Sequence, residues 1–121
     1  MDVTATLSLG DPLEPARKAT AQMLQERERT FSLPQPFYCD ERLFDIDMQE
    51  IFQKEWLIAG MTCEIPTKGN YITLQIGKNP IIVIRGADGV VHAFHNVCRH
   101  RGSRLCTSDK GKVAKLVCHY H

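Results

Sequence analysis

The sequence predicts a mainly β domain of antiparallel strands preceded by one or two N-terminal helices. After residue 57, short apolar runs alternate with polar residues or are bounded by glycine, proline and asparagine, which is typical of strands joined by turns. Before residue 57, segments that start with proline and show helix-like apolar spacing indicate helices. With 121 residues and 43% hydrophobic content, the chain has room for one domain of ordinary size.

Residues 1–38 are predicted to form a leader that contains one helix. This helix would begin at Asp11-Pro12 or Glu14-Pro15, because proline is tolerated in a first turn, and would end near Arg29. Its apolar stripe is narrow, so the helix needs a partner surface in water. The stripe consists of Ala16, Ala19, Met23 and Leu24. The prolines of segment 32–36 then predict an extended stretch.

A second helix is predicted over residues 41–56. Asp45 or Asp47 would cap its start, and apolar residues near its end, Ile51 and Phe52 among them, would form the packed face. Trp56, the only tryptophan in the chain, ends this segment. We expect its side chain to anchor the helix against the domain that follows.

The rest of the chain predicts short strands. Apolar or alternating runs place strands at 57–61, 71–76, 81–84 and 90–96, and a further run lies at 113–117. Turns are expected at 66–70, at 77–80 and at the hairpin signal Ala87-Asp88-Gly89. One loop follows the strand at 90–96 and another follows the run at 113–117. Two loops at the tips of adjacent hairpins would bring side chains from distant sequence positions together.

These two loops carry pairs of metal-binding residues. Cys98-Arg99-His100 is followed, after seventeen residues, by Cys118-His119-Tyr120-His121. Thiolates together with imidazoles bind structural zinc as well as iron–sulfur clusters. Zinc sites usually separate the two residues of a pair by roughly two to five positions, so the single residue between Cys98 and His100 favours an iron–sulfur centre over zinc.

Cys98, His100, Cys118 and His121 resemble the ligand set of a Rieske [2Fe–2S] centre, in which two thiolates hold one iron and two imidazoles hold the other. Two ferric ions, two sulfides and two thiolates sum to zero charge, whereas four thiolates would make the oxidised cluster doubly negative. Rieske potentials accordingly lie at about −150 to +300 mV, against roughly −400 mV for plant-type ferredoxins. The resemblance implies that these four residues bind both the cofactor and its metal ions.

A glycine and a set of basic residues accompany the first pair. Gly102 lies where a loop around a cluster would need positive φ or close backbone approach. Basic residues suit the negative charge of an added electron, and backbone N–H groups in such loops donate to the sulfurs. The alternative is a solvated loop that docks nothing. The basic residues, called here the basic collar, are Arg99, Arg101, Arg104, Lys110, Lys112 and Lys115, opposed by Asp109.

Other residues near the motif are expected to have structural roles. Respiratory-type Rieske proteins resemble this pattern but carry two extra cysteines that link the cluster loops. Ser103 and Tyr120 stand at the matching positions, so that disulfide cannot form here. Cys106 is expected to be a buried or half-exposed thiol. Three histidines are expected in a loop or facing solvent and neighbouring side chains: His92, His95 and His119.

From about residue 37 to residue 121 the sequence resembles the N-terminal Rieske domain of the large (alpha) subunit of Rieske non-haem iron oxygenases. These are the aromatic-ring-hydroxylating dioxygenases and their monooxygenase relatives. The likeness is carried by Glu55-Trp56, by Glu64-Ile65-Pro66 with Gly69, and by segment 96–102. It implies a Rieske domain at 39–121 after a leader at 1–38, truncated at the C-terminus, with the catalytic iron domain absent.

The same resemblance implies an activity. Electrons would pass from NAD(P)H through a flavin/iron–sulfur reductase to the cluster, and on to a mononuclear Fe(II) in the missing domain for O2-dependent hydroxylation. The leader segment 32–38 is similar to the branch of the family that removes N-methyl groups from quaternary ammonium compounds. A homotrimer is expected, and this chain would hold no catalytic residue. The alternatives are a stand-alone Rieske ferredoxin, an aromatic-ring-hydroxylating large subunit and a zinc-stabilised interaction module.

Composition also bears on location and partners. Met1-Asp2-Val3-Thr4 does not begin a signal peptide, and no apolar run approaches the ~20 residues that span a bilayer. Five cysteines, an odd number, do not suggest a secreted disulfide framework. Reduced thiols with an iron–sulfur site fit the cytoplasm. The net charge of +1 gives no support for nucleic-acid binding, so we expect neither a nucleic acid nor a membrane as partner.

Overall fold

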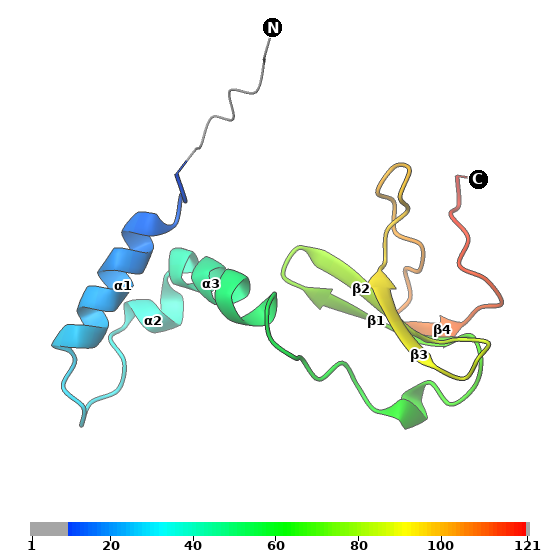
Figure 1. The fold of residues 1–121 in the computed structure, drawn as a ribbon, viewed down its shortest axis with the longest axis horizontal. Helices are drawn as coiled ribbons and strands as arrows, with labels where there is room; N and C mark the ends of the chain where they lie inside the picture. Colours follow the sequence, from blue (N-terminus) through cyan, green and yellow to red (C-terminus); the bar gives the residue numbers. More distant parts are fainter. Residues whose placement is uncertain (1–9, 121) are drawn as a thin grey trace, which may run out of the picture. The chain divides into compact units, whose positions relative to one another are not determined.

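A computed structural model describes residues 10–120 of the chain. The start of the predicted leader, residues 1–9, and the predicted ligand His121 lie outside the described residues. The chain divides into two compact units, Met1–Trp56 and Leu57–His121, which Figure 1 shows as a helical part and a part built on a sheet. The predicted division into a leader at 1–38 and a Rieske domain at 39–121 stays a prediction.

The first unit is helical. Helix α1 spans Glu14–Glu26, α2 spans Pro36–Cys39, and α3 spans Glu41–Asp47 and continues as a π-helix, η1, over Met48–Phe52. Proline lies in the first turn of α1, as predicted, although this helix ends at Glu26 rather than near Arg29. Helix α2 was not predicted. Its first residue is a proline, whose fixed φ suits a first helical position and whose missing N–H is not needed there.

The second predicted helix begins at Glu41, as expected, but its capping residue and its end differ from the prediction. Asp40 caps α3, because its side chain accepts a hydrogen bond from the Arg42 N–H at 2.9 Å. The predicted caps, Asp45 and Asp47, lie inside the helix instead. The helical segment ends at Phe52, so Trp56 lies beyond its last turn. The side chain of Trp56 is 100% exposed, and the predicted anchoring role is therefore wrong for the part of the chain that the structure describes.

Helix α1 packs on α3 through a small apolar contact. Ala16, Leu43 and Met48 are the buried residues of these helices. Of the predicted stripe, Ala16 is buried and Met23 is half-buried, whereas Ala19 and Leu24 are exposed. A contact this narrow stabilises a helix only weakly, so polar contacts must contribute to the docking of α1.

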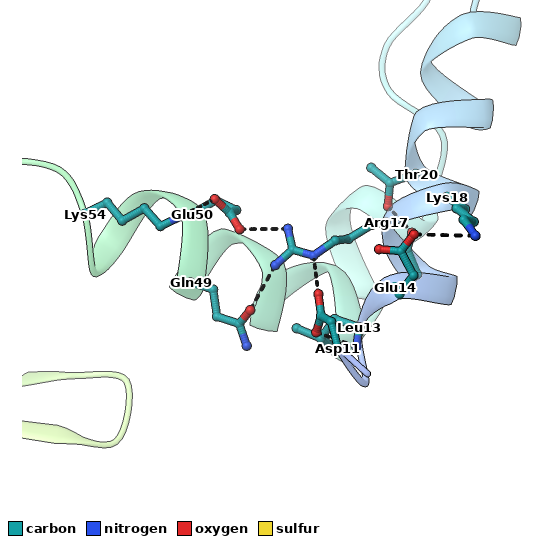
Figure 2. Close-up of polar contacts among 10 residues, drawn as sticks. Asp11, Leu13, Glu14, Arg17, Lys18, Thr20, Gln49, Glu50 and Lys54 are labelled. Atoms are coloured by element: carbon teal, nitrogen blue, oxygen red, sulfur yellow. Dashed lines mark hydrogen bonds and ion pairs between the residues drawn. The ribbon is translucent and has the colours of Figure 1, made fainter. Parts of the chain in front are cut away.

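Arg17 supplies those polar contacts, as Figure 2 shows. Its Nε donates to Asp11 Oδ2 at 2.8 Å, its NH2 group donates to Gln49 Oε1 at 2.9 Å, and its NH1 group pairs with Glu50 Oε1 at 2.8 Å. Hydrogen bonds from the Leu13 N–H and from Arg17 lower the pKa of the Asp11 carboxyl. One side chain therefore links the start of α1 to η1.

The second unit is an antiparallel sheet with strand order β3-β2-β1-β4. The strands are β1 (Asn70–Ile76), β2 (Asn79–Arg85), β3 (Val91–His95) and β4 (Lys110–Lys112). The first three match the predicted strands within a few residues. A tight turn at Gly77, whose φ is +57°, joins β1 to β2.

One predicted strand of this unit is wrong. Residues 57–61 form no strand and lead into a short 3-10 helix, η2 (Thr62–Glu64). Run 113–117 is also irregular, and the strand of this region lies earlier, at β4. Both runs have the composition of strands but find no ladder partner, and a strand forms only where another strand takes up its hydrogen bonds.

The core lies on both faces of the sheet. Neighbouring residues in a strand point to opposite faces, so the pair Tyr71 and Ile82 faces one side while Ile72 and Val83 face the other. Cys106, from the connection between β3 and β4, packs with Tyr71 and Ile82. Half-buried Val113 and Leu116 add to this face of the sheet, which therefore supports the chain leading to both predicted ligand pairs. None of the helices among residues 10–120 is long and apolar enough to cross a membrane.

Candidate metal centre

The connection that carries the first Cys–His pair is closed at its base by a buried asparagine. Asn96 directly follows β3 and is 1% exposed. Its Nδ2 donates to the Cys106 carbonyl at 2.6 Å, and the Cys106 N–H donates to its Oδ1 at 2.9 Å. The Asn96 N–H also donates to the Pro80 carbonyl at 2.8 Å. This amide thus pairs with the backbone as a neighbouring strand would, and it ties together the two ends of the loop.

Inside the loop the backbone makes a tight turn around the first pair. Val97 and Arg104 form an isolated antiparallel bridge. The Cys98 N–H donates to the Ser103 carbonyl at 2.8 Å, and the Gly102 N–H donates to the Cys98 carbonyl at 2.9 Å. Gly102 has φ of +68°, which agrees with the conformation expected from its place in the motif.

Cys98 already accepts a hydrogen bond of the kind found around iron–sulfur clusters. The backbone N–H of His100 lies 3.4 Å from the Cys98 Sγ. The thiol is half-buried, whereas the imidazole of His100 is exposed. N–H groups directed at a thiolate stabilise its negative charge, so this turn suits a sulfur ligand.

The second pair approaches the first through a serine. The Ser103 hydroxyl lies 3.4 Å from the Sγ of Cys118, which is half-buried. Figure 1 shows the loop after β3 and the segment after β4 leaving the sheet on the same side. His119 and Tyr120 lie in an exposed turn, as expected for a loop. The predicted hairpin tips are not adjacent, however, because β3 and β4 lie at opposite edges of the sheet.

The described residues fit a Rieske cluster as far as they reach. Cys98 and Cys118 are half-buried cysteines in two neighbouring loops, and the His100 N–H lies beside the sulfur of Cys98. Among residues 10–120 no three His, Cys, Asp or Glu side chains come together as a metal site, and His121 lies outside that range. The four ligands predicted from the sequence therefore stay a prediction.

Cys106 is a buried thiol, as expected. It is 8% exposed, and this burial raises the pKa of its thiol, with a hydrogen bond from Tyr71 partly offsetting the rise. Burial therefore favours the protonated form of this thiol, which is the form that does not bind metal. His92 pairs with Asp88 at 3.2 Å, and His95 is exposed, so both histidines have the structural roles predicted for them.

The basic collar is exposed to solvent. All six side chains are exposed, and none forms an ion pair within residues 10–120. Arg104 donates to Gln75 Oε1 at 2.6 Å and Lys112 donates to Thr67 Oγ1 at 3.1 Å, and both acceptors are neutral. Residues 98–121 carry six basic side chains and one acidic side chain, which gives a net charge of +5. The other residues of the chain carry nine basic and thirteen acidic side chains, which gives a net charge of −4. The positive charge of the chain is thus concentrated in the sequence segment that carries the candidate ligands.

Sequence reasoning missed the roles of Asn96 and Ser103. In the sequence, Asn96 stands out only as part of the motif and Ser103 only as a position without cysteine. The structural role of Asn96 could have been suspected from its place as a polar residue between an apolar strand and a Cys–His pair. No local pattern indicates the contact of Ser103 with Cys118.

Comparisons with known proteins agree with this geometry. The chain is similar to the glycine betaine monooxygenase oxygenase subunit of Pseudomonas aeruginosa, with 84% identity over 100% of this chain and 28% of that protein. The corresponding subunit of Chromohalobacter salexigens is 69% identical over 100% of this chain and 27% of that protein. The chain thus spans little more than a quarter of the length of these curated relatives.

Solved structures give the same picture. The quaternary ammonium Rieske monooxygenase CntA in complex with its substrate L-carnitine matches with a TM-score of 0.67 and 37% identity. That match covers 73% of this chain and 25% of the CntA chain. The family model for the Rieske [2Fe-2S] domain matches residues 55–121, which include both Cys–His pairs, the loop closed by Asn96 and the whole sheet. On this match, which covers more than half of its residues, the chain belongs to the Rieske [2Fe-2S] domain family.

Proposed function

We propose that this chain is the electron-accepting Rieske domain of an oxygenase alpha subunit, with Cys98, His100, Cys118 and His121 as the ligands of its [2Fe–2S] cluster. When bound, such a cluster supplies reversible one-electron transfer. The observation that carries the proposal is the approach of the two ligand loops, since the hydroxyl of Ser103 lies 3.4 Å from the Cys118 Sγ while its carbonyl accepts from the Cys98 N–H.

The chain's own residues suit an electron acceptor in two ways. The His100 N–H is directed at the Cys98 Sγ, and a donor at this position stabilises negative charge on the sulfur. The exposed basic collar places further positive charge around the loops. Both features favour the more negative, reduced state.

For the whole protein we propose O2-dependent N-demethylation of glycine betaine or a related quaternary ammonium compound. The support is the 84% identity to a glycine betaine monooxygenase oxygenase subunit and the likeness to CntA. A mononuclear Fe(II) site is expected in a part of the protein outside these 121 residues, and we propose a homotrimeric assembly. An aromatic-ring substrate is less well supported, because the biphenyl 2,3-dioxygenase alpha subunit of Rhodococcus jostii is only 38% identical over 78% of this chain.

The proposed partner is an NAD(P)H-dependent flavin/iron–sulfur reductase. A net charge of +5 over residues 98–121 suits a partner that presents an acidic face near its own redox centre. Within residues 10–120 no disulfide joins the cysteines, which fits the reducing cytoplasm as the proposed location of the protein.

Turnover of the full-length protein tests these proposals separately. Purified protein is mixed anaerobically with the reductase and NAD(P)H, and the visible spectrum is followed for cluster reduction. Oxygen and glycine betaine are then added and formaldehyde is measured. Cluster reduction with formaldehyde release is the expected result. Reduction without product from any quaternary ammonium compound would refute the substrate alone, whereas a protein that holds no cluster would refute the electron-accepting role.

A further inference from the structure

Ser103 contacts both candidate ligand loops. Its backbone carbonyl accepts a hydrogen bond from the Cys98 N–H at 2.8 Å. Its hydroxyl lies 3.4 Å from the Sγ of Cys118, which is within hydrogen-bonding distance for sulfur. The two cysteines are separated by nineteen residues in the sequence, and this one residue connects the loops that hold them.

The position of the Ser103 hydroxyl is fixed by the backbone around it. The preceding residue, Gly102, has φ of +68° and donates its N–H to the Cys98 carbonyl. The following residue, Arg104, forms a bridge with Val97. Ser103 itself is half-buried, so its hydroxyl competes less with water for the sulfur than an exposed hydroxyl would.

We infer that Ser103 is a positioning residue, which holds the two ligand loops together and donates its O–H to the Cys118 Sγ when that sulfur is a thiolate ligand. This inference rests on the proposed function, and it adds a residue that adjusts the reduction potential of the proposed cluster. A thiolate has no proton to give, so the hydroxyl must be the donor.

The consequence is a higher reduction potential. Reduction adds one negative charge, part of which reaches the ligand sulfurs, so a donated hydrogen bond is stronger in the reduced state than in the oxidised state. Removing the donor should therefore favour the oxidised state. We expect a change of about tenfold in the ratio of oxidised to reduced protein at a fixed potential, which is ~59 mV for one electron.

The test compares three variants of the full-length protein with its cluster in place. Ser103→Ala removes the hydroxyl, and Ser103→Thr retains it. Thr107→Ala removes an exposed hydroxyl near the same loop and serves as the matched control. Midpoint potentials are measured by spectroelectrochemistry, the reduced protein is examined by EPR, and iron and acid-labile sulfide are counted in each sample.

We expect Ser103→Ala to retain its iron and sulfide, to show a lower potential and to change the g values of the reduced protein. Ser103→Thr should restore both readouts, and Thr107→Ala should match the wild type. A wild-type potential and EPR spectrum in Ser103→Ala would overturn the inference, as would loss of the cluster from both Ser103 variants. Loss of the cluster from Ser103→Ala alone would support the loop-holding role. A wild-type protein without iron and sulfide would instead refute the proposed function, and this inference with it.

Discussion

Replacing Asn96 with alanine tests whether the hydrogen bonds between Asn96 and Cys106 hold the first ligand loop in place. The amide satisfies the N–H and the carbonyl of Cys106, at 2.9 and 2.6 Å, and all the groups involved are buried. A buried polar group left without its partner costs about 1–3 kcal/mol, so the loss of both bonds should lower the free energy of unfolding by about 2–6 kcal/mol. Small domains are stable by only about 5–15 kcal/mol, so the effect is large.

The assay is anaerobic urea unfolding of the full-length protein, followed by far-UV circular dichroism and by the visible absorption of the cluster. Asn70→Ala is the matched control, because the Asn70 side chain accepts only from the N–H and hydroxyl of Thr67, at 3.0 and 2.7 Å, and both bonds are exposed. The control should lose about 1 kcal/mol or less. Equal losses in Asn96→Ala and Asn70→Ala, or an unchanged midpoint in Asn96→Ala, would refute the argument that this buried amide closes the loop.

Three further variants test other parts of the structure. Gly69→Ala and Gly89→Ala both place a side chain at positive φ, which costs about 1–2 kcal/mol. The two variants differ in packing, because a Cβ at Gly69 would lie 2.1 Å from the Val113 carbonyl oxygen whereas a Cβ at Gly89 would meet open space. Gly69→Ala should therefore unfold at distinctly lower urea concentration, and similar midpoints would contradict the packing described. Cys106→Ser should retain its iron and sulfide, because the buried thiol is not a ligand; a colourless variant would show that the ligands have been misassigned. Arg17→Met should lower the midpoint at pH 7. The pKa values of its carboxylate partners, Asp11 and Glu50, are lowered in the folded protein. The ion pairs therefore stabilise the fold fully above the pKa of the unfolded carboxyls, and this stabilisation is lost as the pH falls through the folded pKa. The difference in midpoint between Arg17→Met and wild type should vanish in acid, and a difference that does not change with pH would argue against the pairing.

Much of the sheet could be predicted from the sequence because its signals are local. Glycine and asparagine at the turns, with apolar runs between them, placed β1, β2 and β3 within a few residues. The same signals failed at residues 57–61, where composition favours a strand but no neighbouring strand takes up the hydrogen bonds. The prediction for Trp56 failed for a related reason. Hydrophobicity indicates that burial of a side chain would be favourable, but it does not indicate which residues will pack against that side chain.

The four candidate ligands stay a prediction, and this prediction rests on a different kind of signal. Metal chemistry restricts which residue types serve and how closely two of them can be spaced, so two short Cys–His motifs carry the signal. The supporting contacts follow no such rule. Asn96 meets Cys106 ten residues away and Ser103 meets Cys118 fifteen residues away, and both contacts depend on how the loops fold back on the sheet. Reading them required the three-dimensional structure.

Quantifying iron, zinc and acid-labile sulfide in the complete protein, purified without oxygen, addresses the metal assignment directly. If Cys98, His100, Cys118 and His121 hold a Rieske cluster, each complete chain will contain about two sulfides and about three irons, two in the cluster and one at the proposed mononuclear site, and will show a rhombic EPR signal on reduction. Stoichiometric zinc in a colourless protein, with neither iron nor sulfide, would contradict the assignment.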